Sequence, residues 1–268
     1  MTEKTPCRPY PTARDDEEAA RHTRDTAQTR SSSYRLAFAD PEFLLREDLR
    51  PVRLQLELLK PELAFQEEGI ESTIVVFGSA RTPPPEAEGA DPEKTAVYEE
   101  ARRFAWLMSQ RKNNDGLRNV VVTGGGPGIM EAANRGAHEA GQRTVGLNIV
   151  LPHEQAPNPY ITPDLSFQFH YFAIRKMHFL MRARALVCFP GGFGTMDELF
   201  ETLTLIQTGK VLPIPVLLFR EAWWRRIVNF DAMVEEGVIA PADLDIFRFV
   251  ETAEQAAAVI ESFYGDGG

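Results

Sequence analysis

Short apolar runs alternate with longer amphipathic stretches along the chain after Gly69. A short run of β-branched and apolar residues is typical of a strand buried on both faces, and a longer stretch with apolar residues at helical spacing is typical of a helix. Strands are predicted at Thr73–Phe77, Val120–Thr123, Thr144–Val150, Ser166–Phe169, Ala185–Phe189, Pro215–Phe219 and Phe247–Glu251. Helices are predicted between most of them, at Pro92–Lys112, Ile129–Ala140, Ala173–Arg184, Thr195–Thr208, Glu221–Glu236 and Ala253–Tyr264. This alternation predicts an α/β fold with a doubly wound parallel sheet flanked by helices.

The sequence before Gly69 lacks this alternation and has two parts of different composition. Residues 1–40 are mostly Arg, Asp, Glu, Thr and Ser, and such a stretch cannot bury enough apolar surface to offset the entropy lost on ordering. We expect a flexible polar tail there, either a solvated leader or a functional arm. Residues 41–70 carry apolar residues at mixed helical spacing and predict an N-terminal helical extension, with breaks or first turns at Pro51 and Pro61. Residues 71–268 are then expected to form a single domain.

Composition and charge argue against several classes of protein. The chain has 268 residues, of which 43% are hydrophobic and 25% charged, so it has enough apolar residues for a sizeable core. Its net charge of −10 disfavours nucleic acid and acidic membrane surfaces as partners. Cys7 and Cys188 do not predict a disulfide framework, and the most apolar stretch, Val211–Phe219, is interrupted by two prolines. We therefore expect a cytoplasmic protein with no signal peptide and no membrane span.

Three predicted strand-to-helix turns are rich in glycine or small residues, and ligands of open α/β sheets bind at such turns. The turns are Gly78-Ser79-Ala80-Arg81, Gly124-Gly125-Gly126-Pro127-Gly128 and Pro190-Gly191-Gly192-Phe193-Gly194-Thr195. Glycines let a backbone approach a ligand closely, and the free N–H groups at a helix start attract anions. A lone glycine more simply permits a tight turn. Two glycine clusters at one edge of the sheet favour a phosphate site.

The identity of the phosphate ligand is narrowed by motifs that are absent. Neither glycine cluster matches G-x-G-x-x-G, and G-x-x-x-x-G-K-[ST] does not occur, which disfavours a dinucleotide and a nucleoside triphosphate with magnesium. The five histidines form no metal-binding pattern such as H-E-x-x-H. We therefore expect neither a metal nor another cofactor.

Two cations and one acid are expected near this edge of the sheet. Arg175 and Lys176 are adjacent in a predicted helix and point about 100° apart, so only one of them is expected to face the ligand. His170 and His178 are close to them in sequence and either line the site or are packed histidines. Glu198 is expected in the first turn after a glycine loop, where the helix end keeps it ionised. It is either a charge complement to the helix or a catalytic group.

Two of these segments resemble motifs of a known family. Pro190 to Glu198, with the sequence PGGFGTMDE, is similar to the P-G-G-x-G-T-x-x-E motif of the LOG (Lonely Guy) family, the cytokinin riboside 5′-monophosphate phosphoribohydrolases. Gly124 to Asn134, with the sequence GGGPGIMEAAN, resembles the same family's second signature. The resemblance covers roughly Ser72 to Phe219. It implies a Rossmann-like fold and metal-free hydrolysis of the N-glycosidic bond of a purine nucleoside 5′-monophosphate, a cytokinin riboside 5′-monophosphate or AMP, to free base and ribose 5-phosphate.

The resemblance also implies roles for particular residues. Arg175 and Glu198 would be the catalytic pair. The phosphate and the rest of the nucleotide would be bound by Gly191, Gly192, Gly194, Thr195, Gly125, Gly126, Glu131, Gly78, Ser79, Arg81 and Lys176. The additional residues at the N-terminus and after Phe219 are similar to those of the longer, type II members. A homodimer, or a hexamer assembled from dimers, is expected on the same ground.

Two other functions have been attached to related proteins. Family members have carried the label lysine decarboxylase, which requires a pyridoxal-phosphate lysine that this sequence does not suggest. The alternative hypothesis is a nucleotide or molybdenum-cofactor carrier that uses the same glycine loops without hydrolysis. A carrier has no need of Arg175 and Glu198 together, and their presence favours the enzyme.

Overall fold

The computed structural model describes residues 10–112, 116, 118–152 and 156–265, and it divides into two compact units, residues 1–56 and 57–268. The first unit consists of short helices, and only Asp40 is buried among its described residues. Helix α1 (Ala13–Ala20) begins with a capping box, in which Thr12 and Asp15 exchange backbone-to-side-chain hydrogen bonds. The remaining helical segments are the 3₁₀ helices Ser32–Tyr34, Ala37–Ala39 and Glu47–Leu49, helix α2 (Pro41–Leu44) and the start of α3 (Arg50–Glu67).

The predicted polar tail, residues 1–40, falls in this first unit. Its first nine residues lie outside the part of the chain that is described, and the rest includes α1 and two 3₁₀ helices. The domain boundaries predicted after residues 40 and 70 stay predictions.

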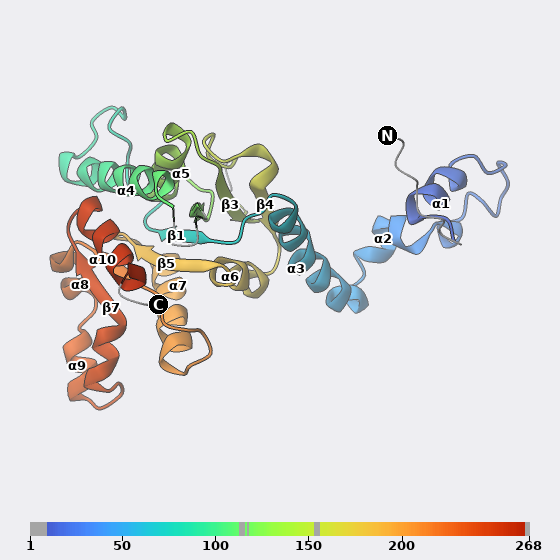
Figure 1. Cartoon of the computed structure of the whole chain (residues 1–268). Helices are drawn as coiled ribbons and strands as arrows, with labels where there is room; N and C mark the ends of the chain where they lie inside the picture. The colour runs from blue at the N-terminus through green and yellow to red at the C-terminus, as the bar shows by residue number, and fades with distance from the viewer. Residues whose placement is uncertain (1–9, 113–115, 117, 153–155, 266–268) are drawn as a thin grey trace. The chain divides into compact units, whose positions relative to one another are not determined.

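The second unit contains a seven-stranded sheet in which every pair of neighbouring strands is parallel. Its strands are β1 (Thr73–Phe77), β2 (Val120–Thr123), β3 (Thr144–Ile149), β4 (Ser166–Phe169), β5 (Ala183–Cys188), β6 (Val216–Phe219) and β7 (Phe247–Val250). They lie in the order β4-β3-β2-β1-β5-β6-β7. Figure 1 shows β1 beside β5 and β3 beside β4. The chain therefore winds outward from β1 in one direction and from β5 in the other. This topology confirms the predicted doubly wound α/β fold and places a switch point between β1 and β5, where such sheets bind ligands.

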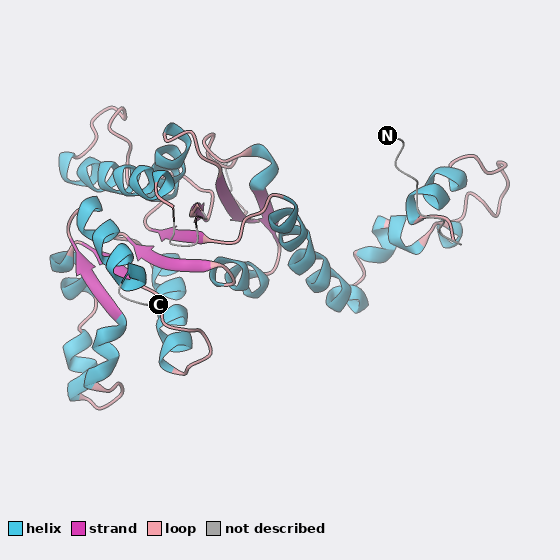
Figure 2. Cartoon of the chain, in the orientation of Figure 1, coloured by secondary structure: helices cyan, strands magenta, loops and turns pink. Residues whose placement is uncertain are grey.

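Helices cover both faces of the sheet (Figure 2). One face packs against α4 (Pro92–Gln110), α5 (Ile129–Glu139) and α10 (Ala253–Gly265). The other packs against part of α3 and against α6 (Phe172–Leu180), α7 (Phe193–Gln207), α8 (Glu221–Ile227) and α9 (Phe230–Glu235). The central strand supplies both cores, because Ile74 and Val76 face the first group and Val75 and Phe77 the second.

Three predictions about individual elements are wrong. The predicted helix Glu221–Glu236 is two helices, because Val228 is extended and the side chain of Asn229 caps a new helix by accepting the Ala232 N–H at 3.0 Å. Pro51 does lie in the first turn of α3, but α3 continues through Pro61 instead of breaking there. Arg184, predicted at the end of a helix, belongs to β5, because this segment pairs with the start of β1.

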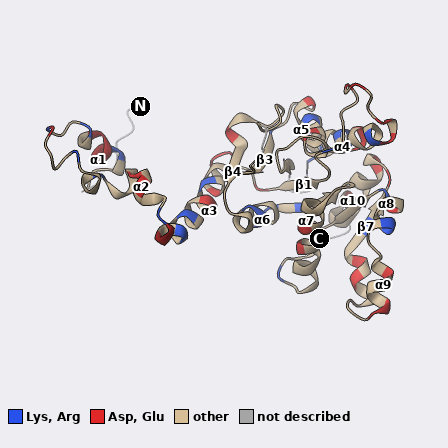
Figure 3. Cartoon of the chain, turned by 180° about the vertical axis from the view of Figure 1, so that it is seen from behind, with Lys and Arg blue, Asp and Glu red and all other residues tan. Residues whose placement is uncertain are grey.

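Opposite charges are interspersed along the helices of this unit. In the view from behind, basic residues of α8 lie near acidic residues of α9 (Figure 3), and Arg225 Nη1 lies 3.2 Å from Asp231 Oδ2. No helix in the described part of the chain is both long enough and apolar enough to cross a membrane.

Candidate active site

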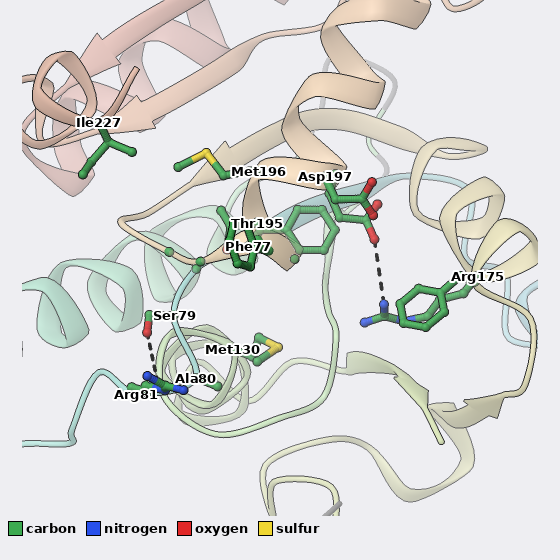
Figure 4. Close-up of a pocket in the computed structure, with 17 residues that line it drawn as sticks. Phe77, Ser79, Ala80, Arg81, Met130, Arg175, Thr195, Met196, Asp197 and Ile227 are labelled. Atoms are coloured by element: carbon green, nitrogen blue, oxygen red, sulfur yellow. Dashed lines mark hydrogen bonds and ion pairs between the residues drawn. The ribbon is translucent and has the colours of Figure 1, made fainter. Parts of the chain in front are cut away.

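A cleft of about 700 Å³ lies where the loops after β1 and β5 meet, at the switch point of the sheet (Figure 4). Nine of the thirteen residues proposed from the sequence line it: Gly78, Ser79, Arg81, Arg175, Gly191, Gly192, Gly194, Thr195 and Glu198. These residues lie in the loop after β1, in α6, in the loop after β5 and at the start of α7, and they are up to about 120 positions apart in the sequence. The cleft therefore depends on the sheet topology rather than on a local motif.

Arg175 is held on several sides. Its Nε donates to the carbonyl oxygen of Leu147, within β3, at 2.7 Å. The guanidinium lies over the rings of Phe179 and Phe172, 5.0 and 5.9 Å from their centroids. A Cβ at Gly124 would stand 2.7 Å from Arg175 Nη2, so a glycine is needed at this position for the guanidinium to lie against the backbone. The surrounding groups therefore fix the orientation of Arg175 before any ligand binds.

Glu198 lies beside Arg175 on the floor of the cleft. Its Oε1 is 3.8 Å from Arg175 Nη1, and only 8% of the Glu198 side chain and 11% of the Arg175 side chain are exposed. Burial raises the pKa of Glu198 to about 7, and the positive charges of Arg175 and Lys176 only partly oppose this rise. At neutral pH the carboxyl group can therefore hold or release a proton readily.

The expectation that a helix end keeps Glu198 ionised is wrong. Helix α7 begins at Phe193, so Glu198 lies in its second turn, where the helix dipole is weak. Desolvation is the larger effect there. The position of Glu198 thus favours a group that exchanges a proton over a simple charge complement.

The backbone of Ser79 joins the two glycine loops. Its N–H donates to the carbonyl of Pro190 at 3.0 Å, and its carbonyl accepts the N–H of Ile129, the first residue of α5, at 3.1 Å. The Ser79 hydroxyl accepts the N–H of Arg81 at 3.0 Å, as Figure 4 shows. At the other loop, a Cβ at Gly191 would collide with the Thr195 side chain, so the first turn of α7 closes tightly onto the loop. The result is a rigid rim with exposed glycines at positions 192 and 194.

Comparison with known proteins agrees with this geometry. A family model described as "Possible lysine decarboxylase" matches residues 130–260. Cytokinin riboside 5′-monophosphate phosphoribohydrolase LOG3 of Arabidopsis thaliana is 28% identical over 149 residues, which cover 54% of this chain and 67% of that protein. The probable phosphoribohydrolase LOGL5 of Oryza sativa subsp. japonica is 29% identical over 179 residues, 65% of this chain and 70% of that protein. The chain therefore resembles proteins of the LOG family in sequence over this region.

One solved structure supports the same fold. The structural-genomics target TM1055 superposes on this chain with a TM-score of 0.50 and 23% identity, covering 71% of this chain and 99% of that one. A molybdenum cofactor carrier protein from Chlamydomonas reinhardtii reaches a TM-score of only 0.48 at 18% identity, over 73% of this chain and 99% of that one, and bears on no question of function here.

Four of the residues proposed from the sequence are not among those that line the cleft. Gly125 and Gly126 lie behind it, where their carbonyls accept from Asn158 Nδ2 at 3.2 and 3.0 Å. Glu131 points toward α4 and accepts the hydroxyl of Tyr98 at 2.9 Å. These three residues support the wall of the cleft instead of forming its surface.

Lys176 is the fourth of these residues, and it joins two helices. Its Nζ lies 2.8 Å from Asp197 Oδ2 and 2.9 Å from Glu201 Oε2, so α6 and α7 are tied together next to Arg175 and Glu198. This is consistent with the expectation that only one of Arg175 and Lys176 faces the ligand.

Sequence reasoning missed the apolar wall of the cleft. Met130, Phe172, Phe193, Met196 and Ile227 line it together with the polar residues, and Figure 4 shows Met196 and Ile227 on the side away from Arg175. Phe193 is 95% exposed and Phe172 is 50% exposed. Phe193 lies between Gly192 and Gly194, and Phe172 lies three residues before Arg175. An aromatic residue at the start of a helix, close in sequence to candidate site residues, is the signal that could have found them.

The family description also names a decarboxylase, and its chemistry would need pyridoxal phosphate held through a lysine amine. No lysine is among the residues that line the described cleft, and Lys176 is engaged by two carboxylates. The cleft does not fit that cofactor. Within the described residues, no group of three or more His, Cys, Asp or Glu is arranged to hold a metal ion.

Proposed function

We propose that this protein hydrolyses the N-glycosidic bond of purine nucleoside 5′-monophosphates, releasing the free base and ribose 5-phosphate without a metal. The observation that carries the proposal is the buried Arg175–Glu198 pair, which faces a cleft rimmed by the PGGFGT loop. The names of the relatives LOG3 and LOGL5 support the same reaction class. They also support a cytokinin riboside 5′-monophosphate as one substrate, with AMP as the second candidate.

The reaction needs opposite charges to be stabilised on its two halves. When the C1′–N bond breaks, positive charge develops on the ribose and negative charge on the base. Glu198 as a carboxylate stabilises the ribose cation and takes a proton from the attacking water. The hydroxyl of that water bonds to C1′ as the C1′–N bond breaks. The departing base takes a proton from solvent, and Glu198 returns the proton of the attacking water to solvent. A base with a pKa near the working pH is well suited to this task, and Glu198 has a pKa of about 7.

Arg175 supplies fixed positive charge beside Glu198 in the same cleft. Its guanidinium is already held by Leu147 and two aromatic rings, so little reorganisation accompanies the reaction. We assign it to anchoring the substrate and to offsetting the negative charge that develops opposite Glu198. Its charge also keeps a share of Glu198 ionised at neutral pH.

The glycine rim would bind the 5′-phosphate. Gly192 and Gly194 are exposed, and they lie at the start of α7, where backbone N–H groups are free to bind an anion. The phosphate takes no part in bond breaking, so its binding serves to position the ribose next to Glu198. The apolar wall that includes Met130 and Phe172 offers a surface for the flat face of a purine.

A comparison of substrates with and without the phosphate tests this proposal. The protein is incubated in a chelating buffer with AMP, with N6-isopentenyladenosine 5′-monophosphate and with the two corresponding nucleosides, and free base is quantified by chromatography. We expect release from one or both monophosphates and little from the nucleosides. Equal cleavage of nucleosides would contradict the phosphate role, and binding without release would favour a carrier.

A further inference from the structure

The start of α6, the helix that bears Arg175, is capped from a distant part of the chain. The N-cap residue Tyr171 forms no side-chain cap of its own. Instead the carboxylate of Glu57, on α3, accepts the N–H of His170 through Oε1 at 2.8 Å and the N–H of Tyr171 through Oε2 at 3.0 Å. Both oxygens are used, and a negative charge at a helix start is favourable.

The same residue connects Glu57 to Arg175. Tyr171 donates its N–H to Glu57, and its carbonyl accepts the N–H of Arg175 at 3.2 Å. A change in the backbone conformation of Tyr171 therefore moves the backbone of Arg175. The guanidinium has little room to compensate, because it is confined between Leu147, Gly124 and Glu198.

A second carboxylate of α3 holds the segment that follows α6. The Glu62 carboxylate accepts hydrogen bonds from both Nη1 and Nη2 of Arg182, at 2.7 and 2.6 Å. This pair lies two turns beyond Arg175 and has no hydrogen bond to the start of α6. Glu62 thus offers an internal comparison, because it joins α3 to the other end of α6 without a hydrogen bond to the backbone near Arg175.

We propose that Glu57 is a positioning residue for Arg175, which orients the first turn of α6 so that the guanidinium meets Glu198. The inference rests on the proposed function for its kinetic consequences, but the geometry it describes can be measured without catalysis. It also gives α3 a part in the site, although no residue of α3 lines the described cleft.

The kinetic test compares three substitutions on α3 in the full-length chain. Glu57→Gln should lower kcat for the monophosphate by about tenfold to a hundredfold, the range produced by a misplacement near 1 Å. KM should change less, because the glycine rim binds the phosphate. Glu62→Gln and Glu67→Gln, the latter at an exposed residue at the end of α3, should leave kcat near the wild-type value. If Glu57→Gln behaves like Glu67→Gln, or if Glu62→Gln lowers kcat equally, the proposal is overturned.

A spectroscopic readout separates this proposal from the proposed function. The charge of Arg175 lowers the pKa of Glu198, so a displaced guanidinium should raise it. The Glu198 carboxyl is titrated by ¹³C NMR in each variant, with Glu198→Gln used to assign its signal. We expect an upward shift in Glu57→Gln alone. If the wild type releases no base, the proposed function fails, and this titration still decides whether Glu57 orients Arg175.

Thermal unfolding of the three variants controls for a general loss of structure. If Glu57→Gln does not fold, Glu57→Asp takes its place, because the shorter side chain keeps the charge but cannot reach both amides. The same fall in kcat and the same rise in the Glu198 pKa are then expected. An aspartate variant with wild-type values for both would overturn the proposal.

Discussion

Burial disfavours the charged form of the Glu198 carboxyl group, whereas its proposed catalytic role requires that form. Burial raises its pKa to about 7, with smaller contributions in the same direction from Glu201 and Asp197. Arg175 and Lys176 act the other way. Protonation of this one group should therefore control both the rate and the stability of the protein around neutral pH.

The rate should rise with pH through the neutral range. If the carboxylate form of Glu198 is the active one, kcat for a monophosphate increases as the pH passes its pKa of about 7 and levels off above it. The measurement is kcat from pH 5.5 to 8.5 at saturating substrate, which removes the titration of the free substrate. Glu198→Gln should lose this rise, and a wild-type profile that is flat or that falls with pH would contradict the assignment.

The stability should change in the opposite sense. The pKa of Glu198 in the folded state lies above its ordinary value of 4.5, so its contribution to folding is full below about pH 4.5 and is lost as the pH rises through about 7. At pH 8.5 the glutamine variant should be more stable than wild type by up to about 3 kcal/mol, as judged from 1.36 kcal/mol per pKa unit. Chemical denaturation at pH 5 and pH 8.5 measures this. If the two proteins differed in their free energy of unfolding by the same amount at both pH values, the prediction would be wrong.

Among the helices, α4 and α5 meet closely over one face of the sheet. Gly136 of α5 lies directly against α4, where a Cβ would collide with the carbonyl of Arg102 and stand 3.0 Å from the Trp106 nitrogen. The contact is between backbones, so neither side can move a side chain away. The close spacing of this helix pair therefore requires a residue without a side chain at position 136.

A methyl group at this contact should be costly. Gly136→Ala should destabilise the protein by about 1–3 kcal/mol, the usual range for overpacking a tight core. Gly194→Ala is the matched control, because Gly194 also lies in a helix but has nothing within 4 Å of its added Cβ. In the absence of ligand, its unfolding midpoint should stay the same or rise slightly. Equal losses in the two variants would show that the α4–α5 contact is not the cause.

The accuracy of the sequence reading also varies by element. The strands were predictable because most of them are apolar on nearly every residue, as β1 and β6 show. The break between α8 and α9 was not, because it depends on an extended Val228 and on a single cap by Asn229. The link between α3 and α6 could not be predicted either, since Glu57 and Tyr171 are 114 positions apart and neither belongs to a recognisable motif.

For the candidate site, too, the features that leave a pattern in the sequence were predictable, and those that depend on the whole fold were not. The PGGFGT loop and its neighbour after β1 were found because glycines leave a sequence pattern, and their convergence follows from the order of parallel strands. The pKa of Glu198 was misjudged because burial depends on the whole fold. Lys176 was assigned to ligand binding because the sequence does not show that Asp197 and Glu201 bind it.

For the molecule as a whole, the division into two units has a consequence for stability. Every buried apolar residue of the described chain lies at or after Pro61, and the described residues before Arg50 contribute only the buried Asp40. The hydrophobic free energy of folding therefore comes from the second unit. The expected homodimer, the hexamer and the cytoplasmic location stay predictions at this scale.

Removal of the first 49 residues should leave the second unit intact. A chain beginning at Arg50 keeps all of α3 and the complete core, so its thermal midpoint should differ from that of the full chain by less than the roughly 2–4 °C that 1 kcal/mol produces in a domain of this size. A chain beginning at Glu68 lacks Glu57, Glu62 and Phe65 and should unfold at a clearly lower temperature. Equal midpoints for the two truncated chains would contradict this division of the stability.

The most direct test of the central claim is an analysis of products from wild type and Glu198→Gln, side by side and without added metal. Each protein is given a purine nucleoside 5′-monophosphate, and both the free base and ribose 5-phosphate are quantified over time. Wild type should release the two in equal amounts, and Glu198→Gln should do so about a hundredfold more slowly or less, as expected when an electrostatic stabiliser is lost. Release of neither product by wild type, or equal rates in the two proteins, would contradict the account.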